Sequence, residues 1–263
     1  VNLKFIEPDK TEVEYLRVTK DLPVKPMEIK PHPDGIELGI LINMLKLTKS
    51  RTLQGFLSSD FSRISQKNAK LICERTNLYP NARPSRIAKQ EADNLLQTLR
   101  DTKFMAPPTD CLSPITSELL KNGLGKEIDA EFYASVTRQA SVYRGNPFII
   151  EAAIAYGGSL DSESQVEIVR FANTVPLQYQ QSACAITKSI ASTNWKQYSL
   201  KQSGRNLPSG PILIAVHIAS VWVPFTSESK EAVAHYPEII KEIKLAVQEC
   251  GRQLGKYLRK QHK

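Results

Sequence analysis

The chain has 263 residues, of which 41% are hydrophobic, and it carries a formal net charge of +8. Its length allows one large or two small globular domains of roughly 100 to 200 residues. No apolar run approaches the roughly 20 residues of a membrane-spanning helix, and residues 1–5 lack the basic-then-apolar order of a signal peptide, so we expect a soluble, cytoplasmic protein.

Residues 1–29 are predicted to form two strands and an extended connector. Apolar and polar residues alternate from Val1 to Thr19 around a turn at Asp9, which is typical of two short strands. Two such strands are too short to fold alone and need neighbours, so we expect the chain to be cut from a larger protein. The connector follows because proline disfavours helix, and its prolines are Pro23, Pro26, Pro31 and Pro33.

Residues 30–105 are predicted to be helical. Apolar side chains recur at helical spacing within 36–45, around 71–72 and within 92–99, and turns are expected at Gly55, at 58–60 and at 80–84. Basic residues outnumber acids here, so one face either tracks a phosphate backbone through charge attraction or is merely solvated. Among them we expect DNA contacts from Lys49, Arg51 and Arg63, without base readout.

Residues 106–263 mix strands with helices. Four strands are predicted at 131–138, 148–155, 166–171 and 212–219. Helices at 180–192 and 237–258 would cover one face of their sheet, so the fold class is α+β, with a two-layer sandwich after a helical domain. The last helix is amphipathic, and its basic end is either solvated or in contact with DNA or a partner.

A short motif, Trp195-Lys196-Gln197-Tyr198, lies between the predicted helix at 180–192 and the last strand. Loops carry function because a rigid frame positions them. One interpretation is a DNA contact, with Lys196 on a phosphate and Trp195 or Tyr198 packing alongside. The other is that Trp195 anchors the loop to the core while Lys196 is solvated, and the sequence leaves both open.

The chain lacks the usual signatures of independent catalysis. It has no Gly-x-x-x-x-Gly-Lys-Ser/Thr loop for a nucleotide. Its histidines have no aspartate or cysteine at ligand-like spacing, so no metal site is expected, and His217, within an apolar strand, should be a satisfied core residue. No Cys-x-x-Cys pair occurs, so we expect buried or half-buried thiols at Cys73, Cys111, Cys184 and Cys250.

Several segments stand in the order found in one family. They are 30–35 (KPHPDG), 51–57 (RTLQGFL), 60–63 (DFSR), 105–114 (MAPPTDCLSP), 142–147 (VYRGNP), 154–158 (IAYGG), 170–173 (RFAN), 175–181 (VPLQYQQ), 195–198 (WKQY) and 220–231 (SVWVPFTSESKE). Through them nearly the whole chain resembles the archaeal-type B subunit of DNA topoisomerase VI. Thr174 and Gln178 depart from the family pattern, which usually has a basic residue and a leucine there.

The resemblance implies three domains. Residues 1–29 would be remnant strands of a Bergerat-type ATPase domain plus the connector, and the rest of that domain is expected before Val1. Residues 30–105 would be a helix-two-turn-helix domain. Residues 106–263 would be a transducer domain of the ribosomal protein S5 domain 2-like class, with a four-stranded sheet, helices on one face and a long C-terminal helix.

The resemblance also implies a role for Lys230. In the family such a lysine senses the terminal phosphate of ATP, which is bound with magnesium mainly by the absent ATPase domain. Without that context, Lys230 would be a first-turn lysine of the last helix, paired with Glu228, Glu231 or solvent. No catalytic residue is expected in this chain, because the cleaving tyrosine and its magnesium-binding carboxylates belong to the A subunit of the family's enzymes.

The function implied is that of one subunit of an ATP-hydrolysing DNA topoisomerase, an isomerase, with this chain inactive alone. It would couple ATP binding and hydrolysis to double-strand passage and relaxation of supercoils. The implied partners are the A subunit of topoisomerase VI, which would meet the face from Arg252 to Lys260, a second B subunit in an A2B2 heterotetramer, and double-stranded DNA, with no membrane and a nucleoid-associated location.

Two alternatives stand beside this function. One is a non-catalytic DNA-binding or scaffolding fragment, such as a topoisomerase-VI-B-like partner of a recombination nuclease. The other is an independent metabolic enzyme, which predicts a closed polar pocket within residues 106–263.

Overall fold

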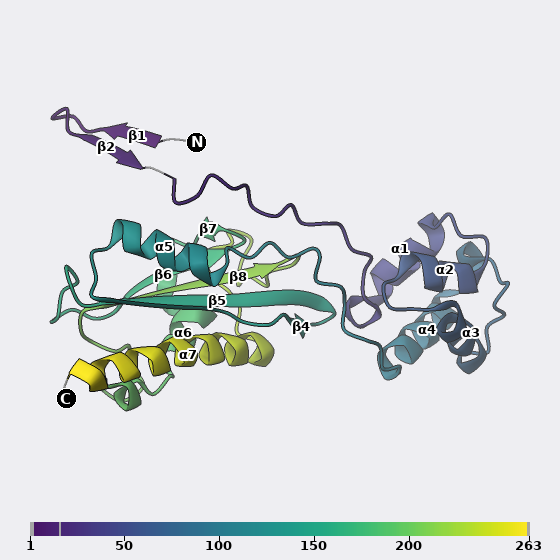
Figure 1. Cartoon of the computed structure of the whole chain (residues 1–263). Helices are drawn as coiled ribbons and strands as arrows, with labels where there is room; N and C mark the ends of the chain where they lie inside the picture. The colour runs from purple at the N-terminus through teal and green to yellow at the C-terminus, as the bar shows by residue number, and fades with distance from the viewer. Residues whose placement is uncertain (1–2, 16, 262–263) are drawn as a thin grey trace.

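The computed structural model describes residues 3–15 and 17–261 (Figure 1). The expected strand start at Val1, and His262 and Lys263 at the end of the last predicted domain, lie outside the described residues. In chain order the molecule consists of a hairpin with its connector, a group of helices, and a sheet covered by further helices (Figure 1).

The first part is an antiparallel hairpin, as predicted. It pairs β1 (Leu3–Ile6) with β2 (Glu12–Tyr15), and Asp9 Oδ1 accepts the Thr11 N–H at 2.9 Å within the turn. Within the described ranges β1 and β2 make a sheet of two strands only, whose side chains are largely exposed. The hairpin therefore has no hydrophobic core of its own.

The connector runs extended from the hairpin to the helices and touches the third part on its way. Ser113 Oγ donates to the Val24 carbonyl at 2.9 Å, and the Met27 N–H donates to the Asp110 carbonyl at 2.9 Å. These contacts hold two segments that lie far apart in the sequence side by side.

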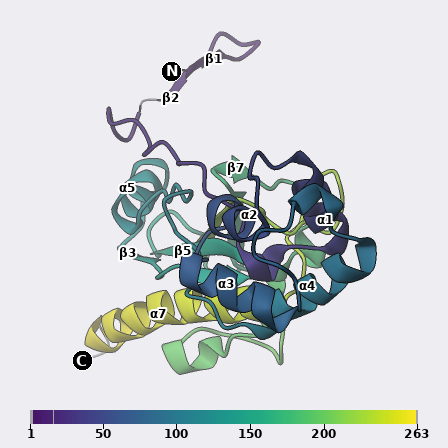
Figure 2. The ribbon, with the colours of Figure 1, turned by 90° about the vertical axis from the view of Figure 1, so that its right-hand side faces the viewer.

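The helical part consists of four α-helices and two short 3-10 helices, which lie in front of the sheet in the view of Figure 2. They are η1 (Pro33–Gly35), α1 (Leu38–Leu47), α2 (Leu53–Asp60), α3 (Gln66–Arg75), η2 (Pro84–Arg86) and α4 (Lys89–Asp101). Their apolar faces enclose one core, which contains Leu41, Leu53, Phe56, Phe61, Ile72 and Leu95. The helical content was predicted; the helix-two-turn-helix arrangement stays a prediction.

One helix replaces the turns expected at Gly55 and 58–60, and that expectation was wrong. Helix α2 begins because the Thr52 side chain caps the Gly55 N–H at 3.1 Å. It continues because Leu53, Phe56 and Leu57 bury one face at helical spacing. The gain from burying that face outweighs the low helix propensity of its glycine and serines.

The third part is built on a sheet of six strands. They are β3 (Phe132–Thr137), β4 (Ser141–Tyr143), β5 (Asn146–Tyr156), β6 (Glu167–Ala172), β7 (Val175–Pro176) and β8 (Ile212–Ser220). Their order is β3-β5-β8-β6-β7, with β4 also on β5, and β6 runs parallel to β8 while the other pairs are antiparallel. All four predicted strands are present, but the sheet has two more, β4 and β7, which corrects the expected four-stranded sheet. These two strands were not predicted, because three and two residues are too few to show a pattern.

Helices cover both faces of the sheet, which corrects the expected single covered face (Figure 1). Helix α6 (Ala185–Ala191), preceded by η3 (Gln181–Ala183), and α7 (Pro237–Gln261) pack on one face, and α5 (Ser117–Glu127) packs on the other. Strand β8 is buried along its whole length, as a strand covered on both sides must be. Helix α5 was not predicted, because its two glycines and few apolar residues weaken the helical pattern.

The helical part meets the sheet where two glycine backbones approach closely. A Cβ atom on Gly145, which has φ +71°, would lie 2.5 Å from the Gly35 backbone nitrogen. Only glycine fits this contact without displacing the chain, because it has no side chain and tolerates the left-handed region. The turn between β4 and β5 is thereby fixed against η1.

Candidate nucleotide-sensing loop and nucleic-acid surfaces

Lys230 stands near the tip of a hairpin-like loop between β8 and α7. Phe225 and Val233 form an antiparallel bridge at its base, and the Thr226 N–H donates to the Ala232 carbonyl at 2.9 Å. The Lys230 N–H donates to the Ser227 carbonyl at 3.2 Å, which closes the turn, and Lys230 has φ +56°. Its backbone conformation is thus set by the turn rather than by a helix.

The base of this loop is attached to the segment before α6. The Ala185 N–H donates to the Val233 carbonyl at 2.9 Å, and the Val233 N–H donates to Cys184 Sγ at 3.4 Å. Beside Lys230, Gln180 Nε2 donates to Glu231 Oε2 at 2.6 Å. The base of the loop is therefore fixed to the body of the domain, while residues 227–230 at its tip are exposed.

The Lys230 side chain is exposed, and within 3–15 and 17–261 no ion pair engages its amine. Lys230 is not a first-turn residue of the last helix, because α7 begins only at Pro237. The adjacent carboxylate of Glu231 already accepts a hydrogen bond from Gln180. An ammonium group in this setting is free to bind an anion presented from outside the domain.

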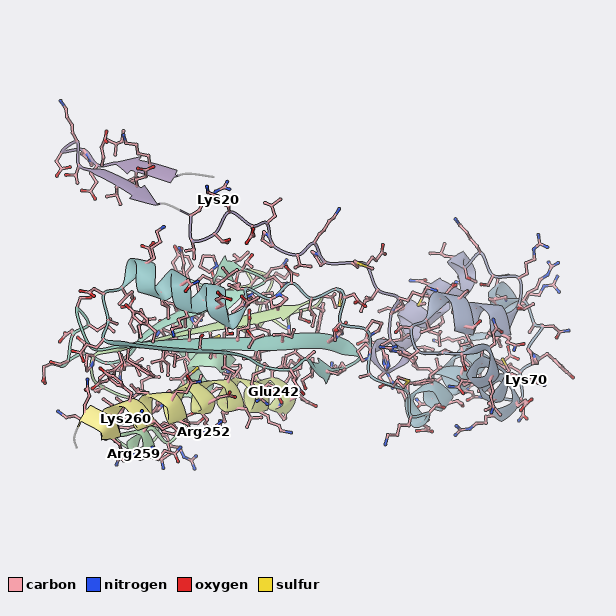
Figure 3. The ribbon with its side chains drawn as sticks, viewed as in Figure 1. Lys20, Lys70, Glu242, Arg252, Arg259 and Lys260 are labelled. Atoms are coloured by element: carbon pink, nitrogen blue, oxygen red, sulfur yellow. The ribbon has the colours of Figure 1, made fainter. Side chains whose placement is uncertain are left out.

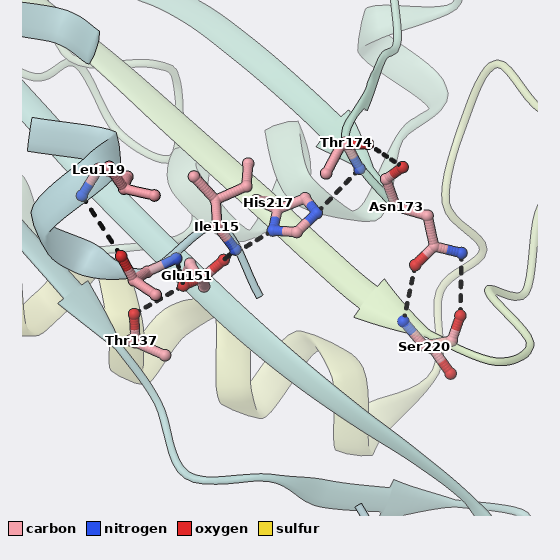
Figure 4. A network of polar contacts seen from close by, with 9 residues as sticks. Ile115, Leu119, Thr137, Glu151, Asn173, Thr174, His217 and Ser220 are labelled. Atoms are coloured by element: carbon pink, nitrogen blue, oxygen red, sulfur yellow. Dashed lines mark hydrogen bonds and ion pairs between the residues drawn. The ribbon is translucent and has the colours of Figure 1, made fainter. Parts of the chain in front are cut away.

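A buried polar row crosses the sheet close to the end of β8 (Figure 4). Glu151 on β5 stands directly opposite Thr137 on β3 and His217 on β8. Glu151 accepts hydrogen bonds from Thr137 Oγ1 at 2.6 Å and from His217 Nδ1 at 2.8 Å. It also accepts from the backbone N–H groups of Ile115 at 2.7 Å and Thr116 at 2.8 Å, so four donors converge on one carboxylate.

The same row reaches the turn between β6 and β7. The Thr174 N–H donates to His217 Nε2 at 3.1 Å, so in the neutral ring the proton lies on Nδ1, which donates to Glu151. Asn173 and Ser220 exchange two further hydrogen bonds of 2.9 Å (Figure 4). His217 is therefore a satisfied core histidine, as expected, and the row ties the end of β8 to its neighbours.

The Trp195–Tyr198 motif forms a short 3-10 helix, η4. Trp195 is 0% exposed and its Nε1 donates to the Ile190 carbonyl at 2.8 Å, while Tyr198 is 6% exposed. Neither ring has a free face for DNA, which corrects the expectation that they pack beside it. Of Trp195, Lys196 and Tyr198, only Lys196 is exposed. The packing of the motif is therefore that of the second interpretation, in which Trp195 anchors the loop to the core.

The three basic residues expected to touch DNA in the helical part are exposed but do not gather in one place. Lys49 and Arg51 precede α2, and Arg51 lines a hollow of about 330 Å³ with Lys46 and Arg83. Arg63 lies beyond the other end of α2, where its Nε donates to the Ala106 carbonyl at 2.7 Å. Arg63 therefore ties the helical part to the following segment, and the basic hollow is the better anion surface.

The last helix has the amphipathic character that its sequence predicts. Its apolar side is buried in the core, and basic side chains of its second half, among them Arg252, Arg259 and Lys260, project from it (Figure 3). In its first half Glu242 accepts from Arg138 Nε at 3.2 Å. The net positive charge is thus concentrated toward the C-terminal end of α7.

Other chemistry finds little support in the described residues. No group of three or more metal-ligating side chains occurs there. The four cysteines are buried and unpaired, as expected, and burial raises the pKa of the Cys250 thiol to about 12 and that of Cys73 to about 11. None of the helices in the described ranges is both long and apolar enough to cross a bilayer.

The chain is similar to one family over much of its length. A family model described as topoisomerase VI B subunit, transducer, matches residues 107–263. The B subunit of type 2 DNA topoisomerase 6 from Methanococcoides burtonii is 48% identical over 259 residues, which are 98% of this chain and 42% of that protein. The protein of the same name from Archaeoglobus fulgidus is 47% identical over 97% of this chain and 42% of its own length.

The chain spans less than half the length of these curated relatives, and more distant likenesses add little. The crystal structure of the B-subunit of the DNA gyrase from Myxococcus xanthus overlaps 54% of this chain and 39% of its own, with 13% identity and a TM-score of 0.32. That overlap is too slight to argue from.

Proposed function

Because this chain belongs to the topoisomerase VI B-subunit family, we propose that it is part of the B subunit of an ATP-dependent type II DNA topoisomerase. In that role it couples ATP binding and hydrolysis to the passage of one DNA duplex through another, which relaxes supercoils. Its partners are the A subunit of the same enzyme, a second B subunit in an A2B2 assembly, and double-stranded DNA. ATP and magnesium are held mainly by an ATPase domain outside this chain.

The observation that carries this proposal is the presentation of Lys230. Its amine is exposed and has no ion-pair partner in the described residues, while bridged backbone on both sides fixes its position. A lysine so placed can complete a phosphate site formed by another domain through a charge-assisted hydrogen bond. ATP offers a terminal phosphate that ADP lacks, so the contact distinguishes the two nucleotides and biases the arrangement of the domains.

The first test replaces Lys230. In a B subunit that carries its ATPase domain and is joined to its A partner, Lys230→Ala should lower the rate of ATP-dependent relaxation by about tenfold or more, because one hydrogen bond to a charged group is lost. The measurement is relaxation of supercoiled plasmid with ATP, beside a binding assay with duplex DNA. DNA affinity should stay within about twofold, because Lys230 contacts nucleotide rather than DNA.

The matched control is Lys241→Ala, which removes an exposed lysine from the nearby first half of α7. It lowers the net charge by the same amount and should leave relaxation unchanged. Equal relaxation rates for Lys230→Ala and the wild type would rule out the phosphate contact.

Lys196 is the second element of the proposed function, as a contact to a DNA phosphate. It is exposed between two buried aromatic residues, so its backbone position is well defined. Lys196→Ala should weaken DNA binding and lower the slope of log affinity against log salt by about one, as the loss of one phosphate contact requires. An unchanged slope in a salt titration with labelled duplex would return Lys196 to the solvated interpretation.

Two further surfaces belong to the proposal. Arg51, with Lys46 and Arg83 around the same hollow, offers a second place for a phosphate backbone. The basic end of α7, from Arg252 to Lys260, is the proposed contact with the A subunit of the enzyme.

A further inference from the structure

Helix η4 presents Lys196 in a constrained way that follows from its geometry. In a 3-10 helix, residues three apart point to the same side, so Trp195 and Tyr198 both face the core. Their rings meet edge to face, with centroids 5.9 Å apart. Lys196 and Gln197 lie between them and are exposed, so the lysine stem starts from a backbone that is held at both ends.

At the Tyr198 end, the ring rests on a helix that has no side chain at the point of contact. A Cβ atom on Gly251 of α7 would lie 2.6 Å from Tyr198 Cδ2 and 2.6 Å from Tyr198 Cε2. A Cβ atom on Gly255, one turn further, would lie 3.4 Å from Tyr198 Cα. The two glycines therefore form a seat that admits the tyrosine, and Gly251 is the tighter of the two positions.

At the Trp195 end, a glutamine side chain closes the loop. Gln202 Oε1 accepts the Trp195 N–H at 2.9 Å. Gln202 Nε2 lies within 3.0 Å of the Ala191 and Thr193 carbonyls and 2.8 Å from the Asn206 carbonyl. This end is fixed independently of α7, so a change at Gly251 alters the Tyr198 end alone.

We propose that Gly251 is a positioning residue for Lys196: by accepting the Tyr198 ring against α7, it fixes the orientation of η4 and so the place of the lysine amine. The proposal rests on the proposed DNA contact of Lys196 and names the residue through which the last helix controls it. Arg252, the next residue of α7, is exposed. The position of η4 thus also sets how Lys196 lies relative to the basic side chains of α7.

The test compares Gly251→Ala, Lys196→Ala and the double variant in the chain as it stands. Labelled duplex DNA is titrated at several salt concentrations, and cooperative thermal unfolding establishes that each variant is folded. Gly251→Ala should displace the ring and lower the salt slope by about one, as Lys196→Ala does. The double variant should lose no more than either single variant, because both act on the same contact.

The matched control is Gly123→Ala, which also adds one methyl group to a helix glycine but meets nothing within 4 Å. It should leave the salt slope unchanged. Tyr198→Ala approaches the same contact without a clash, in case Gly251→Ala does not fold, and should lower the slope by about one as well. Substitution of Gly255 should have a smaller effect than substitution of Gly251, because its contact is longer.

The outcomes separate the positioning role of Gly251 from the DNA contact of Lys196. If Lys196→Ala lowers the slope but folded Gly251→Ala and Tyr198→Ala both keep the wild-type slope, the positioning role is wrong while the DNA contact stands. If Gly251→Ala lowers the slope further in the Lys196→Ala background, it acts elsewhere and the proposal also fails. If Lys196→Ala itself has no effect, the proposed DNA contact is what fails.

Discussion

Glu151→Ala is expected to lower the free energy of unfolding by about 3–5 kcal/mol, the range for removing one member of a buried charged network. Glu151 is 0% exposed and accepts from four donors, so its loss leaves a cavity and deprives four donors of their acceptor, among them the buried His217 ring. Because single domains are stable by only about 5–15 kcal/mol, much of the total would be lost. Urea denaturation followed by circular dichroism measures the change.

Glu167→Ala is the matched control, since Glu167 begins β6 of the same sheet but is exposed. It should change the unfolding free energy by less than about 0.5 kcal/mol. If both variants lost a comparable amount of unfolding free energy, the four hydrogen bonds to Glu151 would make no specific contribution to stability.

The Glu151 carboxyl also predicts a dependence on pH. Burial alone would raise its pKa, but hydrogen bonds from His217, Thr137 and Ile115 hold the pKa below its ordinary 4.5. Since the pKa in the folded state is lowered, the stabilisation is fully present above 4.5 and is lost as the pH falls through the folded-state pKa. The difference in unfolding free energy between wild type and Glu151→Gln should therefore narrow in acid.

Trp195→Ala is expected to lower the free energy of unfolding by about 3–5 kcal/mol, the usual cost of deleting a buried tryptophan. The ring is wholly buried in the core beneath α7, and its Nε1–H satisfies the Ile190 carbonyl. The substitution removes this packing and the indole hydrogen bond, and that carbonyl keeps the Thr193 N–H as a donor at 3.1 Å. Its main effect should appear as a lower denaturation midpoint.

The second tryptophan provides the comparison. Trp222 is 50% exposed and stacks on Tyr143 with centroids 6.4 Å apart, so Trp222→Ala should cost less than about 1.5 kcal/mol. Trp195→Phe should recover part of the loss, because it restores ring volume but not the hydrogen bond. If Trp195→Ala were as stable as Trp222→Ala, the conclusion that Trp195 anchors the loop to the core would be wrong.

Strong local patterns made much of the fold predictable. Strand β3 is indicated by alternating apolar and polar residues, strands β5, β6 and β8 by their apolar residues, and α7 by its 3.6-residue period. Helix α5 was not predicted, because it packs on small side chains of the sheet, among them Ala153, Ala155 and Ala215, and so needs few large apolar side chains of its own. Such a pairing is visible only when both surfaces are known.

The candidate sites were less predictable for a related reason. The sequence identifies Lys230 and Lys196 as lysines in polar segments, but the direction of a side chain depends on distant backbone. The sequence suits Trp195 equally to DNA or to the core, and its hydrogen bond to the Ile190 carbonyl decides for the core. The seat at Gly251 lies more than fifty residues from Tyr198 in sequence, and neither residue alone indicates the other.

Helix α7 starts at Pro237, directly after the loop that carries Lys230, and continues without interruption to Gln261. At about 1.5 Å per residue its 25 residues span roughly 37 Å. Its apolar side is buried from Ile239 to Leu258, so the helix is held to the sheet along most of its length. A displacement at its Pro237 end would therefore carry the sheet with it and reach Arg259 and Lys260 as a movement of the whole domain.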